Sequence, residues 1–242
     1  MAGESLVLLT PVVTAVPLHL KPNAPVAERA LVPGDPGRAL RLAQALLETP
    51  MRVLNTNRGL WGYTGTASDG AGLTIQSTGT GGPSAAIVAE ELIALGARRL
   101  VRVGTCGALD ATLALGDLLA VEVALCGDGT SRALGAGDRA EPDPALTAAL
   151  VAGGAQSAVV ASTDLFYDPD PGGPARWGER GARAVEMEAA ALFTVARRHG
   201  AAAACVLAVT DLLAADGRER IGEDELAAAE LQLGAAGLAA LG

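Results

Sequence analysis

The chain has 242 residues, of which half are hydrophobic and only 2% aromatic, and it carries a formal net charge of −9. Its length suits one large domain with a substantial core built mainly from Ala, Leu and Val, which favours an α/β fold. Nucleic acids and anionic membranes bind cationic surfaces, so neither is expected as a partner of so acidic a chain.

The cysteines and the N-terminus bear on location. Three cysteines without the CxxC spacing of a zinc site indicate reduced, buried thiols: Cys106, Cys126 and Cys205. Such thiols are typical of the cytoplasm, where we expect the protein. The N-terminal run LVLLTPVV is short, contains a proline and follows no basic residue, so neither a signal peptide nor a spanning helix is expected. Residues 1–18 are interpreted as an N-terminal extension and residues 19–242 as one domain.

Strand and helix patterns alternate from residue 29 onward. In chain order, the predicted elements are a strand at 29–35, a helix at 36–48, a hairpin of 61–67 and 72–79, a helix at 83–95, strands at 100–108 and 118–125, a helix at 145–154, a strand at 158–163, a helix at 188–200, a strand at 204–211 and a helix at 222–241. Two Gly-rich segments, 127–142 and 168–174, are interpreted as surface loops. Helices between strands predict a sheet whose ligands gather at the carboxyl ends of the strands.

Four of the predicted strands end in polar or Gly-rich residues, with the sequences PGD, RVGT, STDLF and AVTD. A further Gly-rich stretch, TGTGGPS at 78–84, precedes a helix, so its backbone N–H groups could hold an anion. It lacks both the GxxxxGK[ST] of a P-loop and the GxGxxG of a dinucleotide-binding turn, which argues against ATP and NAD. A purely structural turn is the alternative.

Charged residues inside apolar segments are candidates for a site. Arg102 lies in an apolar strand three residues before Thr105, and a guanidinium beside a hydroxyl suits phosphate, although an internal ion pair is also possible. Glu186 and Glu188 interrupt the apolar run RAVEMEAAALF. Whether this run is helix or strand, at least one of the two carboxylates is expected to face inward, where it needs a partner.

Seven motifs follow one another along the chain: PGDPGR, NRGLWGYTG, GTGGPSAAIVAEEL, RVGTCGAL, STDLFYDPD, AVEMEAAALF and VTD. Together they resemble the nucleoside phosphorylase family, which includes hexameric purine nucleoside phosphorylases and uridine phosphorylases, from about His19 to the C-terminus. The resemblance implies an α/β domain in which helices flank a central mixed, partly barrel-like β-sheet. It also implies inorganic phosphate as co-substrate, without a metal or an organic cofactor.

The resemblance assigns many of these residues to a substrate. The phosphate-binding residues it implies are Gly34, Arg38, Arg102 and Thr105, with Arg58 supplied by a second copy of the chain. The ribose-binding residues are Met187 and Glu188, with His19 reaching across the same boundary. Without the resemblance, Arg38 and Arg58 would be interpreted as surface residues, and His19 as a capping or surface residue.

The resemblance also implies how the base is bound. The base-binding residues are Phe166, Glu186, Thr210 and Asp211, and the catalytic residues are Asp211 and Arg102. A core position for Phe166, a structural role for Glu186 and a helix N-cap for Asp211 are the alternatives. An aspartate at position 211 favours purines, because a carboxylic acid there could protonate N7 of the leaving base. The loop that follows offers Arg218 and Arg220 as candidates to assist it.

The implied reaction is reversible phosphorolysis of a purine nucleoside or deoxynucleoside to free base and the sugar 1-phosphate. Uridine phosphorylase, methylthioadenosine phosphorylase, a hydrolytic nucleosidase and a noncatalytic nucleoside-binding protein are the alternatives. Because Arg58 and His19 would act across a boundary, the implied assembly is a homo-oligomer, with a hexamer built as a trimer of dimers and sites shared within each dimer.

Overall fold

The computed structural model describes residues 16–214 and 217–242. The run LVLLTPVV, and with it most of the predicted N-terminal extension, lies outside these residues. In the described part of the chain, no helix combines the length and the apolar character needed to cross a membrane.

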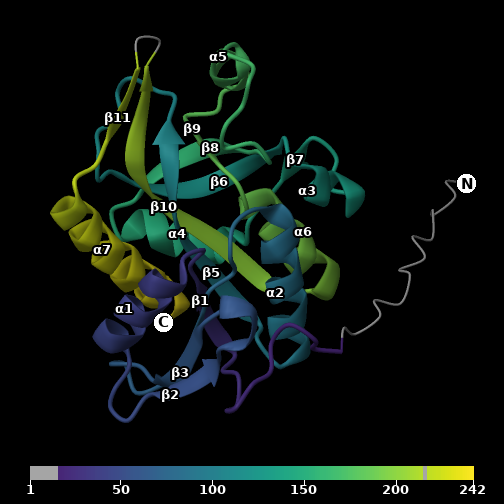
Figure 1. Ribbon diagram of the computed structural model, residues 1–242, viewed down its shortest axis with the longest axis vertical. Helices are drawn as coiled ribbons and strands as arrows, with labels where there is room; N and C mark the ends of the chain where they lie inside the picture. The colour runs from purple at the N-terminus through teal and green to yellow at the C-terminus, as the bar shows by residue number, and fades with distance from the viewer. Residues whose placement is uncertain (1–15, 215–216) are drawn as a thin grey trace, which may run out of the picture.

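One mixed sheet organises the molecule (Figure 1). Its strands are β1 (Arg29–Val32), β2 (Arg52–Asn55), β3 (Gly62–Thr66), β4 (Gly72–Gln76), β5 (Arg99–Ala108), β6 (Leu118–Cys126), β7 (Arg139–Ala140), β8 (Gln156–Ser162), β9 (Ala184–Glu186), β10 (Ala202–Ala214) and β11 (Gly217–Arg220). The helices are α1 (Pro36–Leu46), α2 (Gly82–Ala94), α3 (Gly129–Ala133), α4 (Pro144–Ala152), α5 (Gly173–Glu179), α6 (Ala189–His199) and α7 (Glu223–Leu241), with a 3-10 turn, η1 (Asn57–Gly59).

Part of the sheet closes on itself. The strand order is β11-β10-β6-β8-β9-β5-β1-β4-β3-β2, β7 pairs with β6, and β10 also pairs with β5. Strands β5, β9, β8, β6 and β10 therefore form a ring, and β1 to β4 extend from it. The predicted α/β fold with a mixed, partly barrel-like sheet and flanking helices is confirmed.

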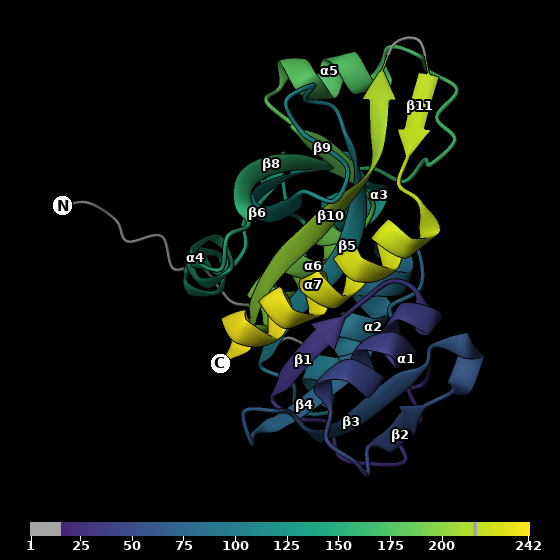
Figure 2. The same ribbon diagram turned by 90° about the vertical axis from the view of Figure 1, so that its left-hand side faces the viewer.

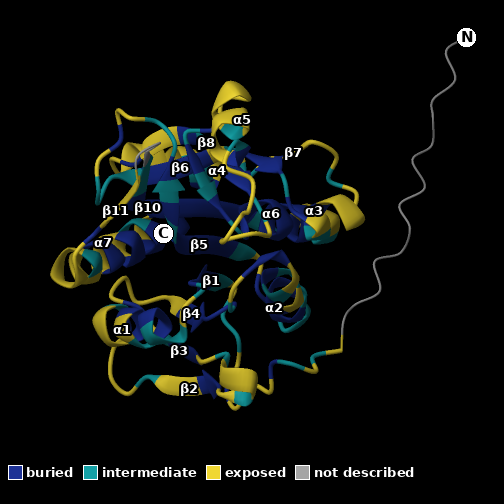
Figure 3. Cartoon of the chain, turned by 45° about the horizontal axis from the view of Figure 1, so that its top comes forward, coloured by how far each residue is buried: buried dark blue, intermediate teal, exposed yellow. Residues whose placement is uncertain are grey.

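Helices cover the sheet from two sides, and a hydrophobic core lies under each set (Figures 1 and 2). One core packs α2 and α6 against the sheet, and the other packs α1, α4 and α7 against it. Both consist mainly of Ala, Leu and Val, as expected, and Phe193 is the largest fully buried side chain. Figure 3 shows the strands mostly buried, whereas α5 and the connecting loops are mostly exposed.

Local chemistry explains where the helices begin and end. Asp35 caps α1 by accepting a hydrogen bond from the Arg38 backbone N–H at 2.6 Å, and Pro36 occupies the first helical position. Gly200 ends α6 in the left-handed conformation, with φ of 65°.

The shortest elements differ from the sequence-based prediction. The predicted surface loop 127–142 contains α3 and β7, because Asp128 caps a short helix and residues 139–140 pair with β6. The predicted surface loop 168–174 runs into α5 at Gly173. Strands β2 and β9 were not predicted, and the predicted loop after residue 211 is instead a β10–β11 hairpin.

Candidate active site

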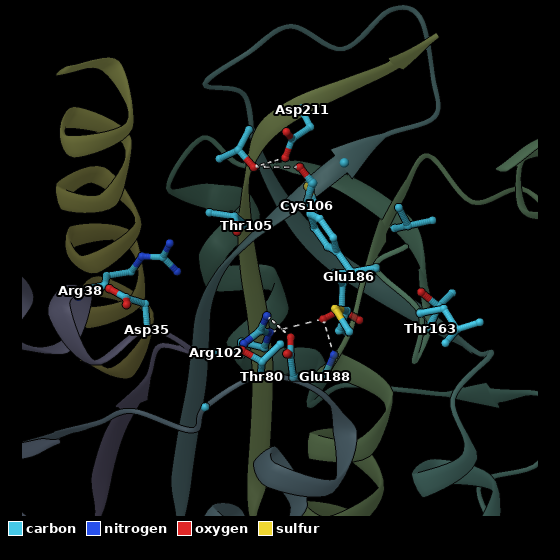
Figure 4. A pocket seen from close by; sticks show the side chains of 18 of the residues that line it. Asp35, Arg38, Thr80, Arg102, Thr105, Cys106, Thr163, Glu186, Glu188 and Asp211 are labelled. Carbon is cyan, nitrogen blue, oxygen red and sulfur yellow. Dashed lines mark hydrogen bonds and ion pairs between the residues drawn. The ribbon is translucent and has the colours of Figure 1, made fainter. Parts of the chain in front are cut away.

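A cavity of about 390 Å³ opens where several strands end (Figure 4). Its lining residues come from the turn after β1, the loop before α2, the second half of β5, the segment after β8, the β9–α6 junction and the β10–β11 hairpin. The predicted residues that line it are Gly34, Arg38, Arg102, Thr105, Phe166, Glu186, Met187, Glu188, Thr210 and Asp211. The fold thus brings together residues up to 184 positions apart in sequence, from Gly34 to Arg218. Among the residues that the structure describes, three guanidinium groups and four carboxyl groups line this cavity.

Arg102 is the most buried cation of the cavity. It extends from β5, is 5% exposed, and forms an ion pair with Glu188 through Nη2. Its Nε lies 3.4 Å from Glu186 Oε2, without hydrogen-bond geometry, and neither Nε nor Nη1 has a hydrogen-bond partner among the described residues. Burial disfavours its charge, but Glu188 and Glu186 hold the pKa of Arg102 above its usual value. Arg102 is therefore charged and has unused donors.

Gly34 lets the turn after β1 approach the Gly-rich loop before α2 closely. A Cβ at position 34 would lie 3.1 Å from the carbonyl oxygen of Gly79 and 3.8 Å from Arg102 Nη1. The backbone N–H of Gly79 in turn donates to the carbonyl of Gly34 at 3.0 Å. The turn after β1 and the Gly-rich loop before α2 therefore pack directly against each other beside Arg102.

Glu188 stands at the N-terminus of α6. Its Oε1 accepts a hydrogen bond from the Gly81 backbone N–H at 2.5 Å, and its Oε2 pairs with Arg102. One backbone N–H of the Gly-rich loop predicted as an anion site thus donates to a carboxylate of the protein itself. Each carboxylate oxygen keeps a lone pair for another donor.

Glu186 has a different set of contacts. Its carboxylate accepts hydrogen bonds from the backbone N–H groups of Glu188 and Ala189 and from the Ser162 hydroxyl. Burial raises the pKa of Glu186, against the opposing effect of Arg102. Both glutamates, which the sequence predicted to need partners, therefore form ion pairs with Arg102. Glu186 also accepts hydrogen bonds from backbone N–H groups at the start of α6.

An ion pair joins Asp211 of β10 to Arg218 of β11, although Arg220 is the residue opposite Asp211 in the strand register. Arg218 Nε donates to Asp211 Oδ1 at 2.8 Å, while Arg220 Nε lies 3.8 Å from the same oxygen and its side chain is 67% exposed. The Thr210 hydroxyl donates to Asp211 Oδ2 at 2.9 Å. Arg218 also lies over the ring of Phe166, 4.6 Å from its centroid. Phe166 is half exposed and lines the cavity, so it is no core residue.

Arg38 reaches the cavity from the first turn of α1 but is anchored behind it. Its Nε donates to Glu230 Oε1 of α7 at 3.0 Å, and its Nη1 lies 3.4 Å from the carbonyl of Val103. Glu230 is 3% exposed and was not identified from the sequence. Because α7 carries other acidic residues in its first turn, a further glutamate in this helix gives no distinctive signal.

Arg58 and His19 do not line the cavity. Arg58 is exposed in η1 and is, in the described part of the chain, the one residue other than glycine with a left-handed φ, 58°. His19 Nδ1 lies 2.8 Å from Glu91 Oε1 of α2, a buried carboxylate that also binds the backbone N–H groups of residues 18–20. The Asn57 side chain donates to the His19 carbonyl at 2.8 Å, so the two segments are joined.

Other residues of the cavity were missed as well, including Thr80, Cys106, Thr163 and Leu213. Thr80 lies in the motif GTGGPS and Thr163 in STDLF, so their position beside the candidate residues was the only sign of them in the sequence. Burial raises the pKa of the Cys106 thiol, which keeps it protonated. Among residues 16–214 and 217–242, no three His, Cys, Asp or Glu side chains gather as a metal site would require.

Comparison with known proteins agrees with the resemblance seen in the sequence motifs. Residues 28–240 match the family model described as the phosphorylase superfamily. The chain is 39% identical to a DeoD-type purine nucleoside phosphorylase of Jannaschia sp. (strain CCS1), over 78% of this chain and 83% of that protein. It is 38% identical to a DeoD-type purine nucleoside phosphorylase of Shewanella denitrificans, over 84% and 87% of the two chains. A guanosine phosphorylase of Halorubrum lacusprofundi is 34% identical, over 83% and 86%. The chain therefore belongs to the phosphorylase superfamily and, within it, to the nucleoside phosphorylase family.

Proposed function

We propose that this protein catalyses the reversible phosphorolysis of purine nucleosides. Inorganic phosphate attacks C1′ of the sugar, the C1′–N9 bond breaks, and the products are the sugar 1-phosphate and the free purine. The observation that carries the proposal is the buried guanidinium of Arg102. It lines the cavity, and two of its nitrogens form no hydrogen bond with any described residue. A phosphate oxygen would satisfy donors that are otherwise costly to bury. The purine nucleoside phosphorylases and the guanosine phosphorylase among the relatives support purine as the base.

Phosphate is proposed to bind between α1 and β5. Arg102 and Arg38 supply charge, the Thr105 hydroxyl supplies a donor, and the missing side chain of Gly34 leaves room for the anion. The chemistry needs no metal and no organic cofactor, since phosphate itself is the nucleophile. Catalysis then rests on orienting two reactants and on balancing charge in the transition state.

The ribose is proposed to lie against Met187 and Glu188. Each oxygen of Glu188 already accepts one hydrogen bond, from Gly81 or from Arg102, and keeps a lone pair for the 2′ and 3′ hydroxyls. In the ion pair with Arg102 this carboxylate acts as an acceptor. Glu188 thus connects the sugar with the phosphate-binding cation.

The purine is proposed to lie between Phe166 and Asp211. Asp211 in its acid form gives its proton to N7 as the C1′–N9 bond breaks, and the carboxylate that results is held by Arg218 through Nε until it takes up a proton again from water. Arg218 also closes the pocket over Phe166. Thr210 fixes the other carboxyl oxygen. Glu186 would contribute through the first turn of α6 more than by touching the base, because its carboxylate already accepts several hydrogen bonds.

The active assembly is proposed to be a homo-oligomer, a hexamer arranged as a trimer of dimers, in which Arg58 and His19 complete the partner's site. The charges favour this arrangement, because the described residues line the cavity with three guanidinium and four carboxyl groups, and a phosphate dianion that enters it needs a further cation. Arg58 is exposed and strained, and Asn57 ties its turn to His19, so both residues could be presented on one face. The three free, buried thiols fit a location in the cytoplasm.

The direct test is release of base from inosine, guanosine, adenosine, methylthioadenosine and uridine, each with and without phosphate. We expect phosphate-dependent release from the purine nucleosides. Release without phosphate would identify a nucleosidase, uridine as the sole good substrate would overturn the choice of purine, and binding without any release would identify a noncatalytic protein.

Shared sites have their own test. Arg58→Ala and Asp211→Asn should each be nearly inactive alone. The first variant lacks a residue that each subunit supplies to its partner's site, and the second lacks a residue of the subunit's own site. Subunits of the two variants, exchanged in one mixture, should regain activity, since a mixed pair contains one complete site. A mixture no more active than its components would contradict sharing.

A further inference from the structure

We propose that Glu230 is a positioning residue for phosphate, acting through Arg38. This inference rests on the proposed phosphorolysis and names the device that aims one of its phosphate-binding cations. Glu230 lies in α7, outside the cavity lining, and its carboxylate is almost fully buried. It contacts Arg38 without lining the cavity itself.

Two of the three nitrogens of the Arg38 guanidinium have protein partners, and the third has none among the described residues. Nε donates to Glu230 Oε1 at 3.0 Å, and Nη1 lies 3.4 Å from the Val103 carbonyl. Nη2 has no protein hydrogen bond in the described part of the chain, although the side chain is only 9% exposed. Because a guanidinium is planar and rigid, fixing Nε fixes where the terminal nitrogens point. The free donors of Arg38 are thereby held toward the cavity that Arg38 lines.

The carboxylate of Glu230 is itself held from a second side. Arg41, one turn after Arg38 in α1, places Nε 2.7 Å and Nη2 2.6 Å from Glu230 Oε2. Arg41 is about half exposed, so it can balance the buried charge without entering the cavity. Glu230 therefore bridges two arginines of one helix, and the one directed inward is the phosphate candidate.

Two glycines bring α7 close enough for this bridge. Gly234 and Gly237 follow Glu230 at spacings of four and seven residues, which places all three on one face of the helix. A Cβ at position 234 would lie 2.4 Å from Leu42 Cδ2 of α1, and a Cβ at position 237 would lie 2.8 Å from Leu31 Cδ2 of β1. In the sequence ELQLGAAGL, the two glycines let α7 pack closely, and this close packing places the carboxylate of Glu230 beside α1.

Loss of the carboxylate would release Arg38 rather than remove it. A buried arginine without an acceptor for Nε turns toward whatever oxygen is near, such as the carboxylate of Asp35 at the start of α1. Phosphate would then have to draw the side chain back, and that cost falls on phosphate binding alone.

Steady-state kinetics of Glu230→Gln, with Glu223→Gln on the exposed side of α7 as a control, tests the inference. The isosteric amide should raise KM for phosphate about tenfold or more, since a charge-assisted hydrogen bond is lost. KM for the nucleoside, and kcat at saturating phosphate, should stay within about threefold. Glu230→Asp, which keeps the charge on a shorter stem, should restore part of the phosphate affinity. Equal rises in both KM values, or no change in either, would overturn the proposal.

A double-mutant cycle separates positioning from general structure. In an Arg38→Met background, Glu230→Gln should raise KM for phosphate no further, because the group it positions is gone. Additive effects would show that Glu230 acts by another route. Should Glu230→Gln fail to fold, Gly234→Ala, which pushes α7 away from α1, should raise the same KM, and an unchanged KM would count against the proposal.

Calorimetric titration with inorganic phosphate alone distinguishes this inference from the function on which it rests. Binding by the wild type with weakened binding by Glu230→Gln supports both. Equal binding by the two proteins overturns the role of Glu230 and leaves the proposed function standing. Absence of phosphate binding by the wild type overturns both.

Discussion

Arg102 and Glu188 form a buried ion pair that ties β5 to the first turn of α6, and the same guanidinium lies 3.4 Å from Glu186 Oε2. One cation therefore faces two carboxyl groups in a place that solvent scarcely reaches. Charges buried in this way are costly to leave without partners. The pair is thus important both for the stability of the fold and for the proposed chemistry.

Replacing Arg102 by Met should lower the free energy of unfolding by about 3–5 kcal/mol at neutral pH, because two carboxyl groups lose their cation. Burial raises the pKa of Glu186 above 4.5, and the charge of Arg102 lowers it. Without Arg102, the pKa of Glu186 should therefore rise further. A raised pKa means that stability is present below about pH 4.5 and is lost as the pH rises through the pKa of the folded state. The deficit should therefore be smaller at pH 5 than at pH 8.

Denaturant unfolding at both pH values measures this deficit, with Arg52→Met, at an exposed arginine of β2, as the control. A deficit that is the same at pH 5 and pH 8 would contradict the assignment of the loss to uncompensated carboxylates.

Asp211→Asn should lower kcat for adenosine by about 10²- to 10⁴-fold, because an amide cannot donate a proton to N7. The amide keeps the shape of the side chain: its carbonyl oxygen can still accept from Arg218, and its NH2 group can donate to the Thr210 hydroxyl oxygen, so binding of the ribose should change little. Single-turnover rates, together with the affinity for ribose 1-phosphate, separate the two effects. Comparable losses in both would argue against a proton donor.

Arg218→Ala and Arg220→Ala form a matched pair on β11. Arg218 donates to Asp211 at 2.8 Å and covers Phe166, whereas Arg220 is 3.8 Å from the same carboxyl and largely exposed. Arg218→Ala should lower kcat/KM by about tenfold or more, since it removes a charge-assisted hydrogen bond and a stacking contact. Arg220→Ala should change it by about twofold or less. The reverse order of effects would reassign the partner of Asp211.

Glu91→Gln should remove a pH-dependent part of the stability. Burial raises the pKa of Glu91, but hydrogen bonds from the Leu20 and Leu18 backbone N–H groups and from His19 outweigh it, so the net pKa lies below 4.5. With a lowered pKa, the stabilisation is present above about pH 4.5 and is lost as the pH falls through the folded-state value.

The difference in unfolding free energy between the wild type and Glu91→Gln should accordingly be largest near pH 7 and shrink toward pH 3. Thermal unfolding at a series of pH values measures it. A difference that grows on acidification would show that the carboxylate of Glu91 does not hold the His19 segment.

The long elements were predictable because their patterns are local. Helix α2 has a proline at its start and an apolar stripe, and β5 is an apolar run ending in glycines. Strands β7, β9 and β11 are two to four residues long, and they exist because a neighbouring strand offers its backbone. Such pairing cannot be deduced from a few residues, which is why the β11 hairpin was predicted as a loop.

The same difference applies to the site. Arg102, Glu188 and Asp211 stand out in sequence because charges interrupt apolar strands or their ends. Glu230 and Glu91 do not stand out, since a glutamate on a helix is ordinarily solvated. Their burial depends on which helix packs against which segment: α7 approaches α1 only because of its glycines, and Glu91 is covered by the segment around His19.

The bridge between Glu230 and Arg38 joins residues 192 positions apart, with Arg38 in the first helix and Glu230 in the last. Contacts so distant along the chain close late during folding, after locally determined parts have collapsed. Arg38 is therefore oriented by Glu230 only when the final helix docks, and an early collapsed form lacks this contact, which we propose positions Arg38 for phosphate. We expect phosphate to slow unfolding of the finished protein while leaving the first steps of refolding unchanged.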